Sequence, residues 1–349
     1  MSSVIHTLPK VDLCCSLLGA LDAETLATVS GDTADGVAAE IAAVHAKMGR
    51  NAEGGGDVGS WLAGLDALAS RFTRAAQLEA VAYVLGQRLI RDSVVHVELG
   101  IDPLRPAIDA GEVAAALERG FERACEDSDD ALLSWRLSAE ARRGDDAEAW
   151  GAAFASMREA VGERICSVAI VGDERVPADA LIAAVQRVRG ELPLLVTAGF
   201  GGAKRELQAA LALHPKRVLY GVSLLRDEAA CADLRARRVP VVALPSVELR
   251  CVLGRPGAPP VLGKLVDAGL FAMLASGAPG VFGSNLSGEF ERTSHALTWR
   301  LDQLRTLTAR AVEVAFIDPR LRFVVARAVE NWRHRPRLTA GPTDDGYGM

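Results

Sequence analysis

The side chains with the clearest chemical potential stand at the ends of short apolar runs. Cys14 and Ser16 close the first run two positions apart, so they share one face of a strand and Cys15 points to the other. Cys14 could act as a nucleophile, with Tyr220 or His96 nearby, if a positive neighbour or a base lowered the pKa of its thiol. The sequence shows no such neighbour, and free cysteine is among the most buried residue types. A buried, inert thiol is therefore the favoured interpretation.

Other side chains near the ends of later runs could contact a ligand. Thr197 and Tyr220 could either hydrogen-bond a ligand or fill space, and nothing in the sequence separates the two. Phe200 could stack on an aromatic ligand or plug the pocket. Glu98 differs, because it lies within an apolar run and must be paired if it is buried. A structural pair with Arg136 or another strand-end arginine is expected, with a functional acid as the alternative.

These side chains belong to a chain in which short β-branched or leucine-rich runs alternate with helical stretches. The runs are residues 11–16, 94–101, 132–138, 165–171, 194–197, 217–220, 239–244 and 271–276. Eight apolar runs separated by helices predict an α/β fold with a parallel sheet, and eight is the number for a closed (β/α)₈ TIM barrel. A doubly wound open sheet is the alternative, but no G-x-G-x-x-G motif follows the first run.

The spacing of the runs also predicts how the chain is divided. Roughly 75 residues separate the first two runs, far more than one crossover helix needs. This insertion includes the small, polar segment 49–60, which could be a lid over the carboxyl ends of the strands or a disordered surface loop. We expect residues 1–332 to form a single domain and the Pro- and Gly-rich segment 333–349 to be a disordered tail.

The composition limits the class of protein. Of the 349 residues, 50% are apolar and the formal net charge is -6, so a large core is available and a nucleic-acid binder is disfavoured. A membrane span is not expected, because uninterrupted apolar stretches of 18 residues are missing. The start lacks the pattern of a signal peptide, which favours the cytoplasm. The six cysteines are scattered without a C-x-x-C pair, so reduced thiols are expected.

Several fragments, in common order and spacing, resemble the motifs of the adenosine deaminase family, which belongs to the metal-dependent hydrolase superfamily. They are LPKVDL at 8–13, DSVVHVE at 92–98, VGDE at 171–174, LPLLVTAG at 192–199, RVLYGV at 217–222, VPVVALP at 239–245, and DAG at 267–269 with Pro279 and Phe282-Gly283 after it. The resemblance covers roughly residues 8–330 and implies the family's barrel.

The family's functional positions hold other residue types in this chain. The family's metal ligands fall on Cys14, Ser16, Thr197 and Gly277. Its proton-moving glutamate, its water-orienting histidine and its second aspartate fall on Phe200, Tyr220 and Ala278. Gly172, whose backbone N–H could face a purine ring nitrogen, is retained.

These substitutions shape the functional prediction. One thiolate and one hydroxyl give too few ligands for zinc, so we expect no zinc cofactor and no family-type deamination. The expected protein is a pseudoenzyme whose barrel mouth holds a purine nucleoside or related small molecule, or serves a partner such as a second copy or an active paralogue. The candidate ligand contacts are Cys14, Ser16, Gly172, Thr197, Phe200 and Tyr220. The alternative is a repurposed, metal-independent enzyme acting through Cys14, Tyr220 and Glu98.

Overall fold

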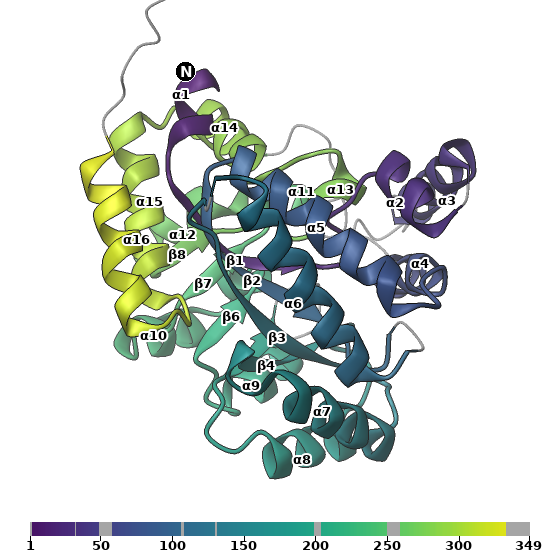
Figure 1. Ribbon diagram of the computed structural model, residues 1–349. Coiled ribbons are helices and arrows are strands. Elements are labelled where there is room, and N and C mark those ends of the chain that lie inside the picture. Colours follow the sequence, from purple (N-terminus) through teal and green to yellow (C-terminus); the bar gives the residue numbers. More distant parts are fainter. Residues whose placement is uncertain are drawn as a thin grey trace, which may run out of the picture.

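Eight parallel strands form the centre of the molecule. The computed structural model describes residues 2–31, 33–48, 58–105, 108–129, 131–198, 204–249 and 259–332. The strands follow one another in the order β1 to β8, each beside its sequence neighbour (Figure 1). Their bounds are β1 Lys10–Ser16, β2 Val94–Ile101, β3 Ser134–Arg142, β4 Ile165–Val171, β5 Leu194–Thr197, β6 Arg217–Leu219, β7 Val241–Ala243 and β8 Ala272–Leu274.

The barrel is joined between its first and last strands just after β8. Gly277 forms a parallel bridge with Cys15. Ser16 N donates to Gly277 O at 2.6 Å, and Gly277 N donates to Cys14 O at 2.9 Å. The strand order and this seam confirm the predicted (β/α)₈ barrel, because a doubly wound sheet reverses its strand order. The strands are buried on both faces, as parallel strands under helices must be.

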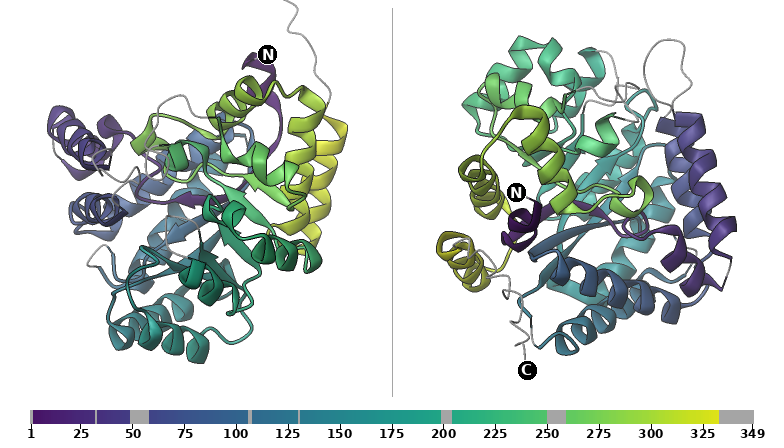
Figure 2. Two further views of the ribbon diagram at one scale, coloured as in Figure 1. Left: turned by 180° about the vertical axis from the view of Figure 1, so that it is seen from behind. Right: turned by 90° about the horizontal axis from the view of Figure 1, so that it is seen from above.

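Helices cover the outside of the sheet, as the three views show (Figures 1 and 2). The longer covering helices are α5 Ala75–Arg91, α6 Ala110–Glu126, α7 Ala147–Val161, α8 Asp179–Val188, α9 Lys204–Leu211, α10 Glu228–Ala236, α12 Val261–Asp267, α14 Leu286–Leu297, α15 Leu301–Val314 and α16 Pro319–Asn331. The short elements are α1 Ser2–Thr7, η1 Gly162–Arg164, η2 Ser223–Arg226, α11 Pro245–Val247 and α13 Pro279–Phe282.

The predicted insertion between β1 and β2 is largely helical. It contains α2 Ala23–Ser30, α3 Ala34–Met48 and α4 Val58–Ala69 before α5 begins. Asp22 caps α2 by accepting from Thr25 N at 2.9 Å. Of the segment predicted to be a lid or loop, residues 49–57 lie outside the described residues and 58–60 belong to α4. The predicted tail 333–349 also lies outside the described residues.

The strand ends differ from the sequence prediction mainly at β3. The predicted run ended at Ser138, whereas β3 continues to Arg142. Its last residues, Ala139 to Arg142, alternate small and charged side chains, and they pair with β4 as far as Arg142 and Val171. The extension brings two charged residues to the carboxyl end of the barrel.

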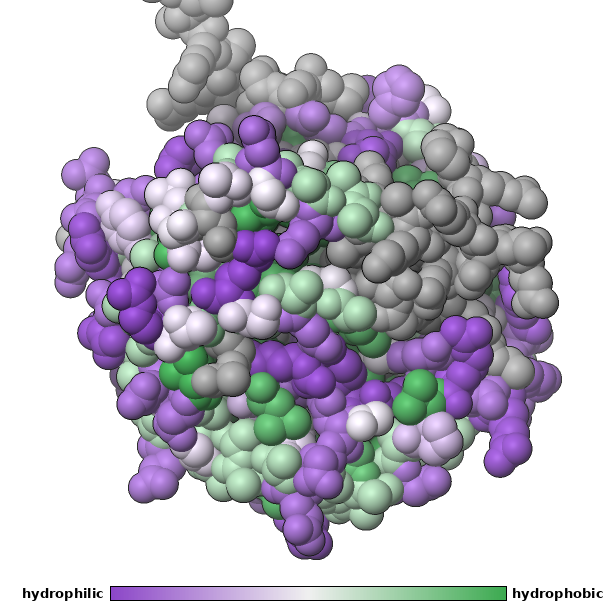
Figure 3. All heavy atoms as spheres, turned by 90° about the vertical axis from the view of Figure 1, so that its right-hand side faces the viewer, coloured by the Kyte–Doolittle hydropathy of each residue, from purple (hydrophilic) through white to green (hydrophobic). Residues whose placement is uncertain are grey.

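On the insertion side, the described residues of the surface are of mixed hydropathy. Figure 3 views the molecule from this side and shows hydrophilic and hydrophobic residues interspersed. Among the described residues, no helix combines the length and the hydropathy needed to cross a bilayer.

Candidate functional site

A cavity of about 60 Å³ lies at the carboxyl ends of the strands, inside the barrel mouth. The predicted site positions that the structure describes all line it: Cys14, Ser16, Gly172, Thr197, Tyr220, Gly277 and Ala278. Phe200 lies outside the described residues. The structure therefore brings the predicted positions together from several strand ends, and their contact with a ligand stays a prediction.

The polar side chains of this set already have local partners. Thr197 Oγ1 donates towards Ile170 O and Gly172 O, both at 3.5 Å, which ties the end of β5 to the end of β4. Ser16 Oγ accepts from Gly19 N at 3.2 Å. Tyr220 adopts a positive φ of 76° directly after β6, a conformation that costs free energy for a residue with a Cβ. This backbone turn places Tyr220 on the wall of the cavity.

Cys14 does not have the surroundings of a nucleophile. Burial raises the pKa of its thiol, and the nearby carboxylates of Glu140 and Asp12 raise it further, against a smaller opposing effect of Arg217. A thiol must lose its proton to attack. The environment of Cys14 thus agrees with the inert thiol expected from sequence.

Glu140 is a residue of the site that sequence reasoning missed. It lies on β3, lines the mouth cavity, and is joined to no other described residue by a side-chain hydrogen bond or ion pair. Burial raises the pKa of its carboxyl to about 7, the Asp102 carboxylate adds to this, and Arg142 opposes it. The alternation of residues 139–142 was the available signal, because a strand extended through them turns Glu140 and Arg142 to one face.

Arg142 connects the mouth to the insertion. Its guanidinium lies 2.5 Å from the Asp66 carboxylate of α4 and 3.8 Å from that of Asp102. Arg105 also pairs with Asp66, at 2.9 Å, and with Asp145, at 2.8 Å. From the same helix, Leu62 and Leu65 line the cavity. Helix α4 therefore covers the mouth and is fastened to the barrel rim by arginines.

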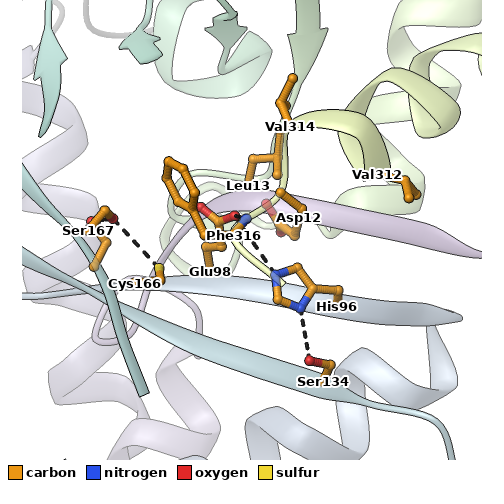
Figure 4. Close-up of polar contacts among 12 residues, drawn as sticks. Asp12, Leu13, His96, Glu98, Ser134, Cys166, Ser167, Val312, Val314 and Phe316 are labelled. Carbon is orange, nitrogen blue, oxygen red and sulfur yellow. Dashed lines mark hydrogen bonds and ion pairs between the residues drawn. The ribbon is translucent and has the colours of Figure 1, made fainter. Parts of the chain in front are cut away.

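Glu98, by contrast, lies away from the mouth cavity. Its carboxylate pairs with Arg217. It also accepts from Phe316 N at 2.7 Å, and His96 lies beside it (Figure 4). The expected partner Arg136 instead donates to Glu163 O. Arg217, the first residue of β6, reaches Glu98 from the other side of the barrel. Burial alone would raise the pKa of Glu98, but Arg217 and His96 lower it to about 2. Glu98 is therefore a paired structural carboxylate and does not share a cavity with Cys14 and Tyr220.

The side chains of the mouth do not match the ligands that a metal ion needs. Within the described parts of the chain, no group of three or more His, Cys, Asp or Glu side chains is placed to hold one. The cavity contains no imidazole among its described lining residues, and zinc prefers imidazole, thiolate and carboxylate ligands. Its possible donors are the buried thiol of Cys14, the single carboxyl group of Glu140 and the hydroxyls of Ser16, Thr197 and Tyr220. These residues do not fit zinc, and the function proposed below has no step through a metal.

Comparison with curated proteins finds relatives named as deaminases. A protein of Rhodospirillum rubrum named adenine deaminase is 29% identical over 333 residues, which is 90% of this chain and 94% of the relative. A protein of the same name from Albidiferax ferrireducens is 26% identical over 245 residues, which is 67% of this chain and 69% of the relative.

Solved structures share the fold. An amidohydrolase from Burkhoderia ambifaria, crystallised with bound Zn, has a TM-score of 0.79 and 22% identity, with 94% of this chain and 91% of the other covered. The ADAL–IMP complex has a TM-score of 0.80 and 18% identity, with 95% and 98% covered.

Two predictions from sequence are corrected by these findings. The prediction of a pseudoenzyme is wrong, because the relatives that align along most of the chain are named adenine deaminase. The prediction that no zinc cofactor is involved is contradicted by the relatives named adenine deaminase together with the structural neighbour that contains bound Zn. Both predictions were drawn from single positions in motifs, whereas the comparisons weigh the whole chain.

The family itself follows from the extent of the match. The model of the adenosine deaminase family, described as "Adenosine deaminase", matches residues 9–332 of this chain, a range that includes every strand of the barrel and the whole insertion. The chain therefore belongs to the adenosine deaminase family.

Proposed function

We propose that this protein removes the exocyclic amino group from an aminopurine bound in the barrel mouth. One observation carries the proposal: the ends of successive strands bring Gly172, Thr197 and Tyr220 around one cavity that also contains a carboxyl group, at Glu140. Active sites of (β/α)₈ barrels lie at this end. The names of the relatives, adenine deaminase, support the same class of reaction.

The lining suits a flat heterocycle with polar edges. Backbone and hydroxyl groups at Gly172, Thr197 and Tyr220 can meet ring nitrogens, and Cys14 and Ser16 supply the facing wall. The charged side chain of Arg142, beside the cavity, gives a nucleotide phosphate a partner that adenine itself would not use. The proposal thus covers free bases, nucleosides and nucleotides of adenine type.

Helix α4 must move before such a ligand can enter. The cavity of about 60 Å³ is far below the roughly 300–1,000 Å³ of ordinary ligand pockets. Leu62 and Leu65 limit it on the side of the insertion. Displacement of α4 removes this limit, and its return would exclude water from the bound ring.

The reaction itself is a hydrolysis. Water adds through its oxygen to the ring carbon that carries the amino group, the carbon–nitrogen bond then breaks, and the amine leaves as ammonia. The products are the corresponding oxopurine and ammonia, so one water is consumed for each amine released.

The test is an assay of ammonia release by the purified full chain with adenine, adenosine and AMP as separate substrates. The metal content of the same preparation is measured by mass spectrometry, and the assay is repeated with added zinc and with a chelator. We expect ammonia and oxopurine in equal amounts with at least one substrate. If none of the three substrates releases ammonia in any of these conditions, the proposed function is wrong.

A further inference from the structure

We propose that Glu140 moves the proton in this reaction, taking it from the attacking water and delivering it to the leaving amine. The inference rests on the proposed function, and it assigns the proton-transfer role to β3, away from the positions Phe200 and Tyr220 indicated by the family motifs. Its basis is the placement of one carboxyl group relative to its neighbours in the mouth.

The first observation is that the barrel makes room for this side chain. Gly100 on β2 is paired with Ser138 on β3, two residues before Glu140. A Cβ added at Gly100 would collide with the carboxylate of Glu140. A side chain at position 100 would therefore have to displace the Glu140 carboxyl group, which Gly100 leaves in its place at the cavity.

The second observation is that Glu140, which is half-buried, differs from the buried carboxyl groups of the barrel. Glu98 pairs with Arg217, Glu248 accepts from Leu244 N, Glu289 accepts from Ser246, and Asp12 accepts from Ser276 N. In the described part of the chain, Glu140 has no comparable partner and opens onto the cavity. A carboxyl group placed in this way is available to a ligand.

The third observation concerns the charges around the group. Cys14 on β1 and Tyr220 after β6 share its cavity, and burial raises the pKa of the Cys14 thiol, so that it is uncharged at neutral pH. Asp102 after β2 and Arg142 on the same strand act on it in opposite directions. Asp66 of α4 draws the Arg142 guanidinium towards the rim. Burial then places the pKa of Glu140 at about 7, so both protonation states are populated near neutral pH, as an acid–base group requires.

The proton transfer is balanced within one turnover. The Glu140 carboxylate accepts one proton from the water whose oxygen bonds to the ring carbon. The addition moves the electron pair of the ring carbon–nitrogen double bond onto the ring nitrogen. That pair re-forms the double bond as the bond to the amino group breaks, and the protonated carboxyl donates its proton to the leaving amino nitrogen. Glu140 ends the cycle as the carboxylate with which it began, and water is the only co-reactant.

The experiment compares two glutamates changed in the same way. Glu140→Gln keeps the shape of the side chain and removes its titratable proton. The control is Glu248→Gln, which changes a buried carboxyl group whose pKa is also raised to about 7. Glu248 does not line the cavity. We expect Glu140→Gln to lower kcat by about 10²–10⁴-fold with little change in the affinity for the oxopurine product. Glu248→Gln should leave kcat close to that of the wild type.

The pH profile gives a readout that a structural role would not affect. Because the carboxylate starts the cycle, kcat/KM of the wild type should rise with pH through about 7, and this limb should be missing in Glu140→Gln. In Glu140→Ala, which leaves a gap above Gly100, added formate or acetate should restore part of the turnover.

The outcomes are distinguishable. If the wild type releases ammonia and Glu140→Gln retains both its rate and its pH limb, the role of Glu140 is refuted while the proposed function stands. Equal losses in Glu140→Gln and Glu248→Gln, without rescue of Glu140→Ala by carboxylates, also refute it, because the loss then reflects weakened folding. A wild type that releases no ammonia refutes both proposals.

Discussion

The two ends of the barrel each contain a glutamate, which is buried in one case and half-buried in the other, and the two have different surroundings. At the floor, which is the end of the barrel opposite the mouth, Glu98 is 1% exposed. Its carboxylate pairs with Arg217, and His96 and Phe316 N lie beside it. At the mouth, Glu140 has Arg142 as a neighbour, but Arg142 is turned to Asp66 and Asp102. The carboxylate of Glu98 therefore has an ion-pair partner and a hydrogen-bond donor, whereas the carboxyl group of Glu140 faces the cavity.

The difference shows how one barrel can combine stability with chemistry. Burial disfavours the charged form of both glutamates, but the pKa of Glu98 is lowered to about 2 by Arg217 and His96. The pKa of Glu140 is raised to about 7, because Arg142 does not offset burial and Asp102. A carboxylate that never gains a proton can only hold the fold together, whereas one that titrates near neutral pH can take part in a reaction.

The largest expected effect is at the floor. Arg217→Met removes the partner of Glu98 and leaves an uncompensated buried charge, so the free energy of unfolding should fall by about 3–5 kcal/mol. Urea denaturation followed by circular dichroism measures this change. The double variant Glu98→Gln/Arg217→Met is the control and should recover part of the loss, because it buries no unpaired charge. A single variant as stable as the wild type would contradict the structural role of the floor pair.

The second prediction is that the two glutamates contribute opposite pH dependences to stability. The pKa of Glu140 is raised from 4.5 to about 7 in the folded state, so its contribution is full below about pH 4.5 and is lost as the pH rises through 7. The pKa of Glu98 is lowered from 4.5 to about 2, so its contribution is full above about pH 4.5 and is lost as the pH falls towards 2.

Thermal denaturation between pH 3 and pH 9 tests this pair of signs. The difference in stability between Glu140→Gln and the wild type should change between about pH 4.5 and 7, with the variant gaining relative to the wild type as the pH rises. The matched difference for Glu98→Gln should change only below about pH 4.5. Asp12 and Glu248 also have raised pKa values, but they are common to all three proteins and cancel in the differences. Differences that do not vary with pH would contradict the assignment.

The strands were predictable from sequence because their signal is strong. The runs for β2, β4 and β5 match the observed strands to the residue, since short β-branched runs between helical stretches are typical of parallel strands buried on both faces. The end of β3 was missed, because alternating alanines and charged residues at 139–142 do not form an apolar run. Burial on one face only, next to a cavity, is what permits that pattern.

The site was predictable in its location and not in its chemistry. Cys14, Thr197 and Tyr220 surround one cavity, because the ends of parallel strands meet at one end of the barrel. The pairing of Glu98 with Arg217 was not foreseen, since it joins strands on opposite sides of the barrel, 119 residues apart in sequence. The proximity of Glu140 to Gly100 was missed for the same kind of reason. The sequence shows only a glycine within an apolar run, and the fold shows the carboxyl group that lies beside it.

The smallest expected effect concerns how firmly the mouth is closed. Asp66 of α4 is 41% exposed and pairs with Arg142 and Arg105, and exposed pairs contribute only about 0.2–1 kcal/mol each. Asp66→Asn should therefore lower the global stability by about 1 kcal/mol or less, while amide hydrogen exchange in α4 becomes faster than in the wild type.

Asp145→Asn is the matched control, because Asp145 also pairs with Arg105 but does not belong to α4. Higher salt should mimic Asp66→Asn, since salt screens partly exposed ion pairs. Unchanged exchange in α4 after Asp66→Asn would mean that Leu62 and Leu65 hold the helix by apolar contact, and that the mouth is closed as firmly as the floor.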